Sequence, residues 1–440
     1  MVLIRSCLRL LLLLLLAPVV AEAADCNRST PDAITHVRLP GTPFTALPSA
    51  DGCWIFVSLS SASSSAGGAV AVLGRDNGVI ALQQMVHLRG APTGMVLSHD
   101  GRLLIVPNGA GVAFLDVQRL ETGAANAVLG YWGNDNDTPG HIYATVTADD
   151  RYLFVSNEAA GTISVIDVAA VYRSHFSRDP LVGTILIGSN PVGLALSTDE
   201  RYLFATVQEM KSFGWPDRCR PETDPHAEPD HAEGAVVVMD VRLAISDPRN
   251  SVLKWVGAGC NPVRVVTSAA NGEVYVTARG SHTLLAFTQT QLTQPGYDTR
   301  PAEIPVGAAP VGVAVIDNGH KVVVTNSDRF GNGGANTPSL FVIDASDVAT
   351  GAARIIGVLP AKGFPREIRT TADGSTLLVT NFSAGTLEVV DLSRRPWVFS
   401  PVEASWMAAA DIQFNLSLRG PLVAGNATPG AVPWAGLPLR

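Results

Sequence analysis

The sequence predicts an all-β fold: a single seven-bladed β-propeller of four-stranded antiparallel blades, covering residues 33–391 of the 440. The main observation is a turn dipeptide followed by an apolar strand, which recurs at intervals of 49, 49, 50, 72, 47 and 55 residues. Asp-Gly and Asn-Gly favour hairpin turns because Gly, Asn and Asp tolerate positive φ. The seven copies are Asp51-Gly52, Asp100-Gly101, Asp149-Asp150, Asp199-Glu200, Asn271-Gly272, Asn318-Gly319 and Asp373-Gly374.

Each copy of the turn has the same surroundings. A proline and a short apolar strand precede it, as in Pro191-Val192-Gly193, and a β-rich run ending in Val-Thr-Asn follows it, as in Val324-Thr325-Asn326. A third strand then ends near an Asp, and an edge-type strand completes the unit. Four short strands in a repeat of about 50 residues are typical of a propeller blade.

The ends of the repeat region predict how the ring closes. Residues 33–40 have the pattern of a fourth strand without a blade of its own, whereas the last repeat ends at Asp391 without a fourth strand. We therefore expect the N-terminal strand to complete blade seven, because no sheet edge is then left free at the seam.

Composition excludes two classes of protein. With 47% hydrophobic and 16% charged residues, the chain is too apolar and too sparsely charged to be disordered. Lys plus Arg number 31 against 39 Asp plus Glu, a net charge of −8. No basic excess is present to neutralise a phosphate backbone, so we expect no nucleic-acid partner.

Residues 1–23 have the pattern of a signal peptide. Arg5 and Arg9 precede an unbroken leucine run, residues 10–16, and Ala21-Glu22-Ala23 is a small-x-small cleavage site. The apolar stretch is too short to span a bilayer, and an uncleaved anchor is the alternative. We expect a secreted, extracellular protein (periplasmic if the source is bacterial) without a transmembrane segment in the mature chain.

The cysteines support the same compartment. Cys7 leaves with the signal peptide, and an even number in the exported chain predicts two disulfides, for which three pairings are possible. We favour Cys26–Cys53 and Cys219–Cys260 because each pair brackets one structural unit. Catalytic or metal-binding thiolates are the alternative, although no C-x-x-C spacing occurs.

Two further features concern the surface of the molecule. Residues 392–440 are expected to form a tail that packs on the propeller or is partly disordered. Sequons predict N-glycosylation if the source is a eukaryote; they lie at Asn27, Asn136, Asn381, Asn415 and Asn426.

Departures from the repeat point to a candidate site in the central channel, which the first strand of each blade lines. The residue six positions before the turn is Gly in three blades, but Tyr143, Glu367 and, allowing one deletion in its turn, Arg264 stand there in others. Blade three also has His141 where other blades have Pro. The remaining candidates are the neighbours of Glu367, Arg366 and Arg369, and two residues that follow second strands, Glu158 and Arg279.

These residue types around a water-filled channel suit a carboxylated substrate. The planar fork of Arg donates two parallel hydrogen bonds to a carboxylate, so Arg264 and Arg366 are candidate anchors. His141 or Glu367 would transfer a proton. Tyr143, Glu158, Arg279 and Arg369 would contribute to binding. The alternative is that Arg264 and Glu367 only pair with each other and fill the channel.

The Val-Thr-Asn endings, together with the variant Val155-Ser156-Asn157, resemble the YVTN-type β-propeller repeat. That family is similar to the lactonase-like propellers, which include 6-phosphogluconolactonase and the carboxymuconate-lactonising enzymes. The resemblance covers residues 33–391. It implies a seven-bladed fold, and a mixture of His, Arg and Glu at the channel mouth for an enzyme of this type.

An insertion accounts for the 72-residue interval and occupies residues 209–234, within blade four. Its density of proline predicts a loop rather than a helix. His226 and His231, with the nearby acidic residues, are suitable metal ligands in kind, but their spacing matches no motif and we expect a solvated acidic loop without a metal or cofactor.

Two functions follow from these observations. The first is a lactonase- or cycloisomerase-like enzyme that acts on a small carboxylated or lactone substrate at the channel mouth. The second is a non-catalytic secreted propeller that binds a protein or glycan through its loops, with Phe213 and Trp215 exposed on the rim. Convergence of His141, Arg264 and Glu367 on one point would favour the enzyme.

Overall fold

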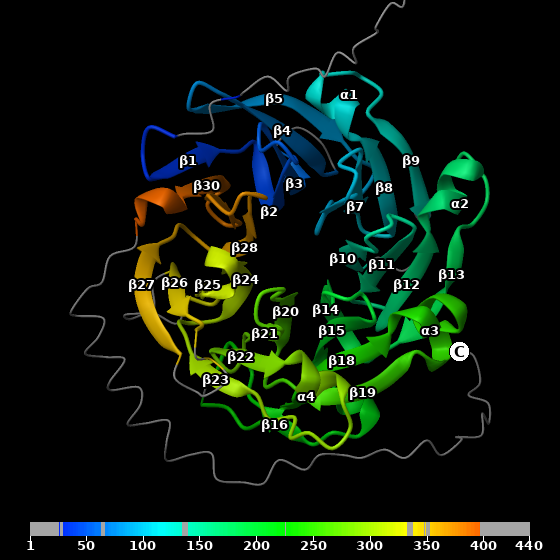
Figure 1. Ribbon diagram of the computed structural model, residues 1–440, viewed down its shortest axis with the longest axis vertical. Coiled ribbons are helices and arrows are strands. Elements are labelled where there is room, and N and C mark those ends of the chain that lie inside the picture. Colours follow the sequence, from blue (N-terminus) through cyan, green and yellow to red (C-terminus); the bar gives the residue numbers. More distant parts are fainter. Residues whose placement is uncertain are drawn as a thin grey trace, which may run out of the picture.

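The computed structural model describes residues 26, 30–62, 67–133, 140–224, 226–331, 338–346, 348 and 353–396. Seven four-stranded antiparallel sheets surround a central axis in these ranges, which confirms the seven-bladed propeller (Figure 1). First strands such as β10, β14, β20 and β24 lie next to the centre, and fourth strands such as β13 and β19 form the outer rim. Among the described residues, no helix has the length and apolar character needed to cross a membrane.

The first three blades follow one another along the chain. Blade one contains β2 (Gly41–Pro48), β3 (Trp54–Ala62), β4 (Ala69–Asp76) and β5 (Val79–His87). Blade two contains β6 (Val96–Leu97), β7 (Leu103–Pro107), β8 (Gly111–Asp116) and β9 (Val128–Gly133). Blade three contains β10 (His141–Val146), β11 (Tyr152–Asn157), β12 (Thr162–Asp167) and β13 (Leu181–Leu186).

The remaining blades repeat this order, with one exception at the seam. Blade four contains β14 (Ser189–Leu196), β15 (Tyr202–Glu209), β18 (Ala235–Asp240) and β19 (Val252–Gly257). Blade five contains β20 (Pro262–Thr267), β21 (Glu273–Ala278), β22 (Thr283–Thr288) and β23 (Ala302–Pro305). Blade six contains β24 (Pro310–Ile316), β25 (Lys321–Asn326), β26 (Ser339–Asp344) and β27 (Arg354–Pro360). Blade seven contains β28 (Pro365–Thr370), β29 (Thr376–Asn381), β30 (Thr386–Asp391) and β1 (Ile34–Arg38).

The N-terminal strand closes the ring as predicted. β1 pairs antiparallel with β30, so that Ile34 lies opposite Val390 and Arg38 opposite Thr386. Figure 1 shows this pairing as the blue β1 beside the orange β30. The disulfide Cys26–Cys53 then ties the segment before β1 to the first blade. β1 therefore covers the edge of β30 and gives blade seven its fourth strand where the ring closes.

The turn dipeptides that defined the repeat connect the first and second strands of each blade. Their second residues all have positive φ, which confirms the turn prediction; these are Gly52, Gly101, Asp150, Glu200, Gly272, Gly319 and Gly374. In five blades a hydroxyl two residues before the turn Asp bonds to its carboxylate, as Ser98 does to Asp100 at 2.6 Å. We call the end of the propeller that carries these turns the turn side, and the opposite end the loop side.

Short helices follow several third strands, and the sequence analysis did not predict them. They are α1 (Val117–Glu121), α2 (Val168–Arg173), α3 (Val241–Ser246) and α4 (Gln289–Thr293). The residue that ends each preceding strand caps the helix, because its side-chain oxygen accepts a main-chain N–H; these caps are Asp116, Asp167, Asp240 and Thr288. The 3₁₀ turns are η1 (Lys211–Phe213), η2 (Pro248–Asn250), η3 (Asp317–Gly319) and η5 (Leu392–Arg394).

The hydroxyl residue of the Val-Thr-Asn signature links neighbouring blades. Thr380 donates a hydrogen bond of 2.9 Å across the seam to the carbonyl of Phe44 in blade one. Ser58, Ser156, Thr206 and Thr277 make the equivalent bond to the first strand of the next blade. The large apolar side chains pack between blades, as Phe154 of blade three does with Leu203 of blade four. The repeat signature is therefore a record of blade-to-blade packing.

The insertion in blade four forms a small hairpin, β16 (Asp217–Cys219) with β17 (His231–Ala232). The disulfide Cys219–Cys260 fastens it to the start of blade five, so both predicted pairings are confirmed.

Several predictions concern residues outside the described ranges. They are the signal peptide, the tail from residue 397 onwards and the sequons at Asn27, Asn136, Asn415 and Asn426. Asn381 is described, fully buried, and donates its amide N–H to Glu388 at 3.1 Å. The predicted glycosylation of Asn381 is therefore wrong for the folded chain, because a glycan has no room there.

Candidate functional site

The middle of the central channel is apolar. Side chains from the first strands of five blades, and one from the residue before the first strand of blade seven, meet there in one buried cluster, which contains Phe44, Ile142, Tyr143, Val192, Val263, Val311 and Phe364. The three valines each follow a proline in the repeated Pro-Val pattern. That pattern is therefore explained by side chains that fill the channel. The expectation of a water-filled channel is wrong at this level.

Three departures from the repeat converge on the turn side of this apolar ring. At the equivalent position of blade four, a Cβ on Gly193 would lie 2.7 Å from the carbonyl oxygen of Val263, so glycine is needed for close contact with the next blade. Tyr143, Arg264 and Glu367 occupy the same position in their own blades and place side chains in the channel instead. All three are at least 97% buried, with exposed fractions of 3%, 2% and 1%.

The charged groups form one connected cluster. Arg264 Nε donates to Glu367 Oε2 at 2.7 Å, and Arg369 Nη1 lies 2.6 Å from Glu367 Oε1. Arg369 Nη2 donates to the hydroxyl of Tyr143. The guanidinium carbon of Arg264 lies 4.3 Å from the centroid of the Tyr143 ring, a cation–π contact. The structure thus joins four of the residues that the sequence singled out.

Electrostatics keep this cluster ionised and positive. Burial raises the pKa of Glu367, but the guanidinium groups of Arg264 and Arg369 outweigh burial and hold that pKa below its usual value. Burial raises the pKa of Tyr143 to about 12, so its hydroxyl stays protonated at neutral pH. Two guanidinium groups against one carboxylate leave one net positive charge, which favours binding of an anion.

Only one of the three guanidinium nitrogens of Arg264, Nε, has a hydrogen-bond partner within the described residues. Its terminal nitrogens Nη1 and Nη2 are buried and have no hydrogen-bond partner within the described residues. Leaving charged donors unpaired in the interior is costly, because their hydration is lost without replacement. Nη1 and Nη2 together have the geometry to donate two parallel hydrogen bonds to one carboxylate.

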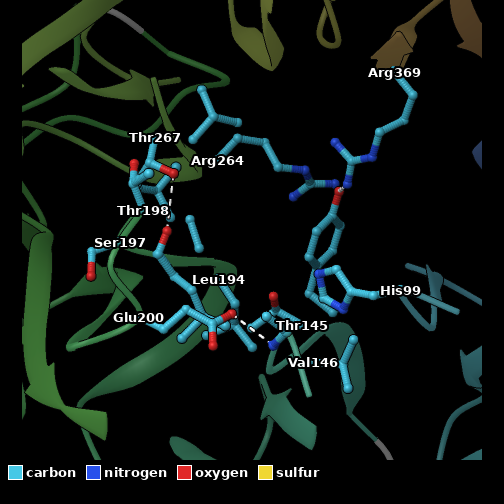
Figure 2. Close-up of a pocket in the computed structure, with 16 residues that line it drawn as sticks. His99, Thr145, Val146, Leu194, Ser197, Thr198, Glu200, Arg264, Thr267 and Arg369 are labelled. Carbon is cyan, nitrogen blue, oxygen red and sulfur yellow. Dashed lines mark hydrogen bonds between the residues drawn. The ribbon is translucent and has the colours of Figure 1, made fainter. Parts of the chain in front are cut away.

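A cavity of about 530 Å³ lies on the turn side against this cluster, and Arg264, Arg369 and Tyr143 line it (Figure 2). Its walls come from blades three, four and five, including Thr145, Leu194 and Thr267. Two further liners, His99 and Glu200, stand in the turns, where most blades have smaller residues. We call this space the turn-side cavity.

The sequence analysis missed His99 and Glu200, although a signal existed. His99 precedes the turn Asp at a position that is Ala in blades one, three and seven, and Glu200 replaces the usual turn glycine. His99 Nδ1 lies 3.0 Å from Asp150 Oδ1 of blade three. Departures in the turns were therefore as informative as departures in the strands.

His141, a predicted proton-transfer residue, does not line the turn-side cavity. It begins β10, at the end of the strand away from the turn, and is 5% exposed. Its Nδ1 lies 3.1 Å from the carbonyl oxygen of Gly109, and its ring packs edge-on against Trp132 with centroids 5.5 Å apart. The expected convergence of His141 with Arg264 and Glu367 on one cavity is wrong, because the strand carries them to different levels.

Arg366 lies among aromatic rings near the apolar ring of the channel. Its guanidinium carbon is 3.8 Å from the centroid of Phe44 and 5.2 Å from that of Phe382. Burial, together with the charges of Arg264 and Arg329, lowers the pKa of Arg366 to about 9. It is not one of the cavity liners.

The loop side carries a separate ion pair. Arg279 binds both carboxylate oxygens of Glu222, a residue of the insertion, at 2.7 and 2.8 Å. Gln208 lies within 3.4 Å of both Arg279 and Glu158. Glu158 and Arg279 thus belong to a network that holds the insertion, away from the turn-side cavity.

The described residues of the insertion bring no set of metal ligands together. There, as in the rest of the described chain, no group of three or more His, Cys, Asp or Glu could hold a metal ion. Phe213 is 40% exposed but packs on Trp255, with ring centroids 5.2 Å apart, and Trp215 packs against the core of blades three and four.

Comparisons with known proteins support the fold alone. No family model matches this chain, and no curated protein sequence matches it. Among solved structures, hydrazine synthase of Kuenenia stuttgartiensis is similar, with a TM-score of 0.58 and 16% identity over 81% of this chain and 97% of that chain. In all, 1357 solved chains match, so the similarity identifies a widely used propeller architecture and leaves function to the site itself.

Proposed function

We propose that this protein binds a small carboxylated molecule in the turn-side cavity. The observation that carries the proposal is the pair of buried, unpartnered nitrogens of Arg264 beside the cavity. A ligand carboxylate would accept both of their hydrogen bonds and neutralise the net positive charge of the cluster. The cavity volume of about 530 Å³ is in the range of small-molecule sites.

Glu367 has a positioning role in this proposal. Its carboxylate is held by Arg264 and Arg369, and these contacts lower its pKa, so it is a poor proton donor at neutral pH. It instead fixes the orientation of both guanidinium groups. The ring of Tyr143 packs against Arg264, and its hydroxyl accepts a hydrogen bond from Arg369. The site is therefore preorganised for an anion before any ligand arrives.

Isothermal titration calorimetry with a panel of small aliphatic carboxylic acids and lactones tests this function. Arg264→Lys keeps a cation beside Glu367 but removes the forked pair, so carboxylate affinity should fall by about tenfold or more. Arg173→Lys, at an exposed pair with Asp167, serves as the matched control and should bind normally. Unchanged affinity in Arg264→Lys, or no binding across the panel, would contradict the proposal.

Lactone hydrolysis, which the resemblance to lactonase-like propellers implied, is the second candidate. The specific observation is the His99–Asp150 pair at the edge of the cavity, since a carboxylate-bound imidazole can act as a general base. Water would add to the lactone carbonyl, the ring C–O bond would break, and the hydroxy acid formed would carry a carboxylate for Arg264.

Acid release from a lactone panel, followed at constant pH, tests this chemistry. His99→Gln should abolish turnover, whereas His141→Gln should retain it. Loss of activity only in the His141 variant would instead support the assignment made from sequence.

We also infer that the protein is exported, because two disulfides are typical of oxidising compartments. The signal-peptide pattern of residues 1–23 supports the same location. Binding of a protein or glycan through the insertion is the weaker proposal, because Phe213 and Trp215 are both packed against the propeller.

A further inference from the structure

The turn-side cavity has opposite charges at its two ends. Arg264 and Arg369 stand together on one side, and Glu200 lies across the cavity from them (Figure 2). The rest of the lining is mixed: the aliphatic Val146, Leu194 and Leu196 share it with the hydroxyl residues Thr145, Ser197 and Thr267. A ligand that spans this cavity therefore meets cations at one end, a wall of mixed polarity, and a carboxylate at the other end.

Glu200 occupies a backbone position that does not suit it. Its φ is 53°, in the left-handed region, where five other blades have glycine. One carboxylate oxygen accepts the N–H of Ala148 at 2.7 Å, which links the turns of blades three and four. Its other oxygen has no hydrogen-bond donor in the part of the chain that the structure describes. The strained glutamate thus offers one free acceptor at the cavity.

The charges of the site sum to zero once Glu200 is included. Arg264 and Arg369 contribute two positive charges, and Glu367 and Glu200 contribute two negative ones. A simple carboxylic acid would add a net negative charge and offer no donor to the second carboxylate oxygen of Glu200. A ligand with one carboxylate and one ammonium group would complement both ends and bring no net charge.

We propose that the ligand is dipolar, a small amino carboxylate whose carboxylate binds Arg264 and whose ammonium group binds Glu200. This inference rests on the proposed carboxylate-binding function and specifies its ligand class. The aliphatic part of the lining, which includes Val146, Leu194 and Leu196, accommodates a short methylene chain between the two charged groups, because burial of methylene groups is favourable.

Calorimetry with matched ligands tests the inference at neutral pH. 6-Aminohexanoate and hexanoate share the carboxylate and the chain and differ in the ammonium group, and longer and shorter pairs cover the span of the cavity. The amino acid of the best-fitting length should bind at least about tenfold more tightly than its unsubstituted acid. Hexylamine, which lacks the carboxylate, should bind weakly.

Glu200→Gln isolates the second charge. Glutamine still accepts the N–H of Ala148, so the turn should keep its fold. The ratio of the affinity for the amino acid to the affinity for its unsubstituted acid should nevertheless fall to about one. Asp199→Asn is the matched control: Asp199 belongs to the same turn, bonds Ser197 at 2.6 Å and does not line the cavity. This variant should keep the full preference.

The outcomes separate the two proposals. If hexanoate and its amino acid bind equally, or if the preference survives in Glu200→Gln, the dipolar ligand is excluded while carboxylate binding stands. If no member of either series binds, the carboxylate-binding function itself fails, and the dipolar ligand fails with it.

Discussion

Two buried glutamates of blade seven have opposite electrostatic surroundings. Glu367 stands in β28 at the channel and Glu388 in β30 at the seam, with exposed fractions of 1% and 0%. Glu367 contacts two guanidinium groups, and its pKa lies below the usual value. Glu388 accepts one hydrogen bond, from Asn381, and burial raises its pKa to about 7.

The two glutamates differ in how many cations lie near the buried carboxylate. At the seam His36 Nδ1 is 3.8 Å from Glu388, and the distant charge of Lys362 lowers the carboxyl pKa only in part. At the channel the cations outnumber the carboxylate. A buried charge is tolerated where partners are supplied and is neutralised where they are not, and the excess of cations in the channel is what the proposed anion binding requires.

Breaking the channel cluster should give the largest effect. Arg264→Met leaves Glu367 with Arg369 alone in a buried site, and the free energy of unfolding should fall by about 4 kcal/mol. Chemical denaturation measures the loss.

The double variant Arg264→Met/Glu367→Gln provides the control for this prediction. It removes both charges together and should recover to within about 1 kcal/mol of the parent protein, since no ionised carboxylate is left short of partners. Equal losses in the single and double variants would show that packing, rather than charge compensation, explains the effect.

The seam should respond in the opposite direction. In the unfolded chain the carboxyl of Glu388 has a pKa near 4.5, whereas in the folded chain it is about 7. The folded state therefore binds the proton more tightly, and its stability falls as pH rises from about 4.5 to about 7. Glu388→Gln should remove that loss and raise stability by roughly 3 kcal/mol at about pH 8.

Thermal unfolding across this pH range checks the sign. The variant and the parent should have similar midpoints at about pH 4 and diverge from about pH 4.5 upwards, with the variant the more stable and the difference complete at about pH 7. A parallel pair of curves would mean that Glu388 remains ionised throughout, through compensation by His36 or Lys362.

The architecture could be predicted from the sequence because its signals are local and repeated. A turn such as Asp100-Gly101 reports its own backbone geometry, and the spare strand at residues 33–40 leaves only one way to close the ring. The short helices were missed, although Asp116 and Asp167 cap them, because a single Asp at a strand end has many other uses.

The site was predicted in part, for a physical reason. Tyr143, Arg264 and Glu367 share one position of the repeat, so the propeller symmetry brings them to one level of the channel. His141 is only two residues from Tyr143, yet that offset moves it towards the other end of the strand. Glu200 was missed although it replaces the usual turn glycine, because the search for departures covered the strands and left out the turns.

A third carboxylate, that of Glu222, extends the comparison to a partly exposed ion pair, for which we expect the smallest loss of stability. Glu222 binds Arg279 through both oxygens, but the two side chains are 12% and 10% exposed, and the disulfide Cys219–Cys260 holds the same insertion. Glu222→Gln should therefore cost about 1 kcal/mol and open the insertion locally rather than unfold the propeller. Limited proteolysis should show faster cleavage within residues 209–234, whereas Glu228→Gln, an exposed change in the same segment, should not. If the two variants are cleaved alike, the pair adds nothing beyond the disulfide, and the contrast between Glu367 and Glu388 belongs to full burial alone.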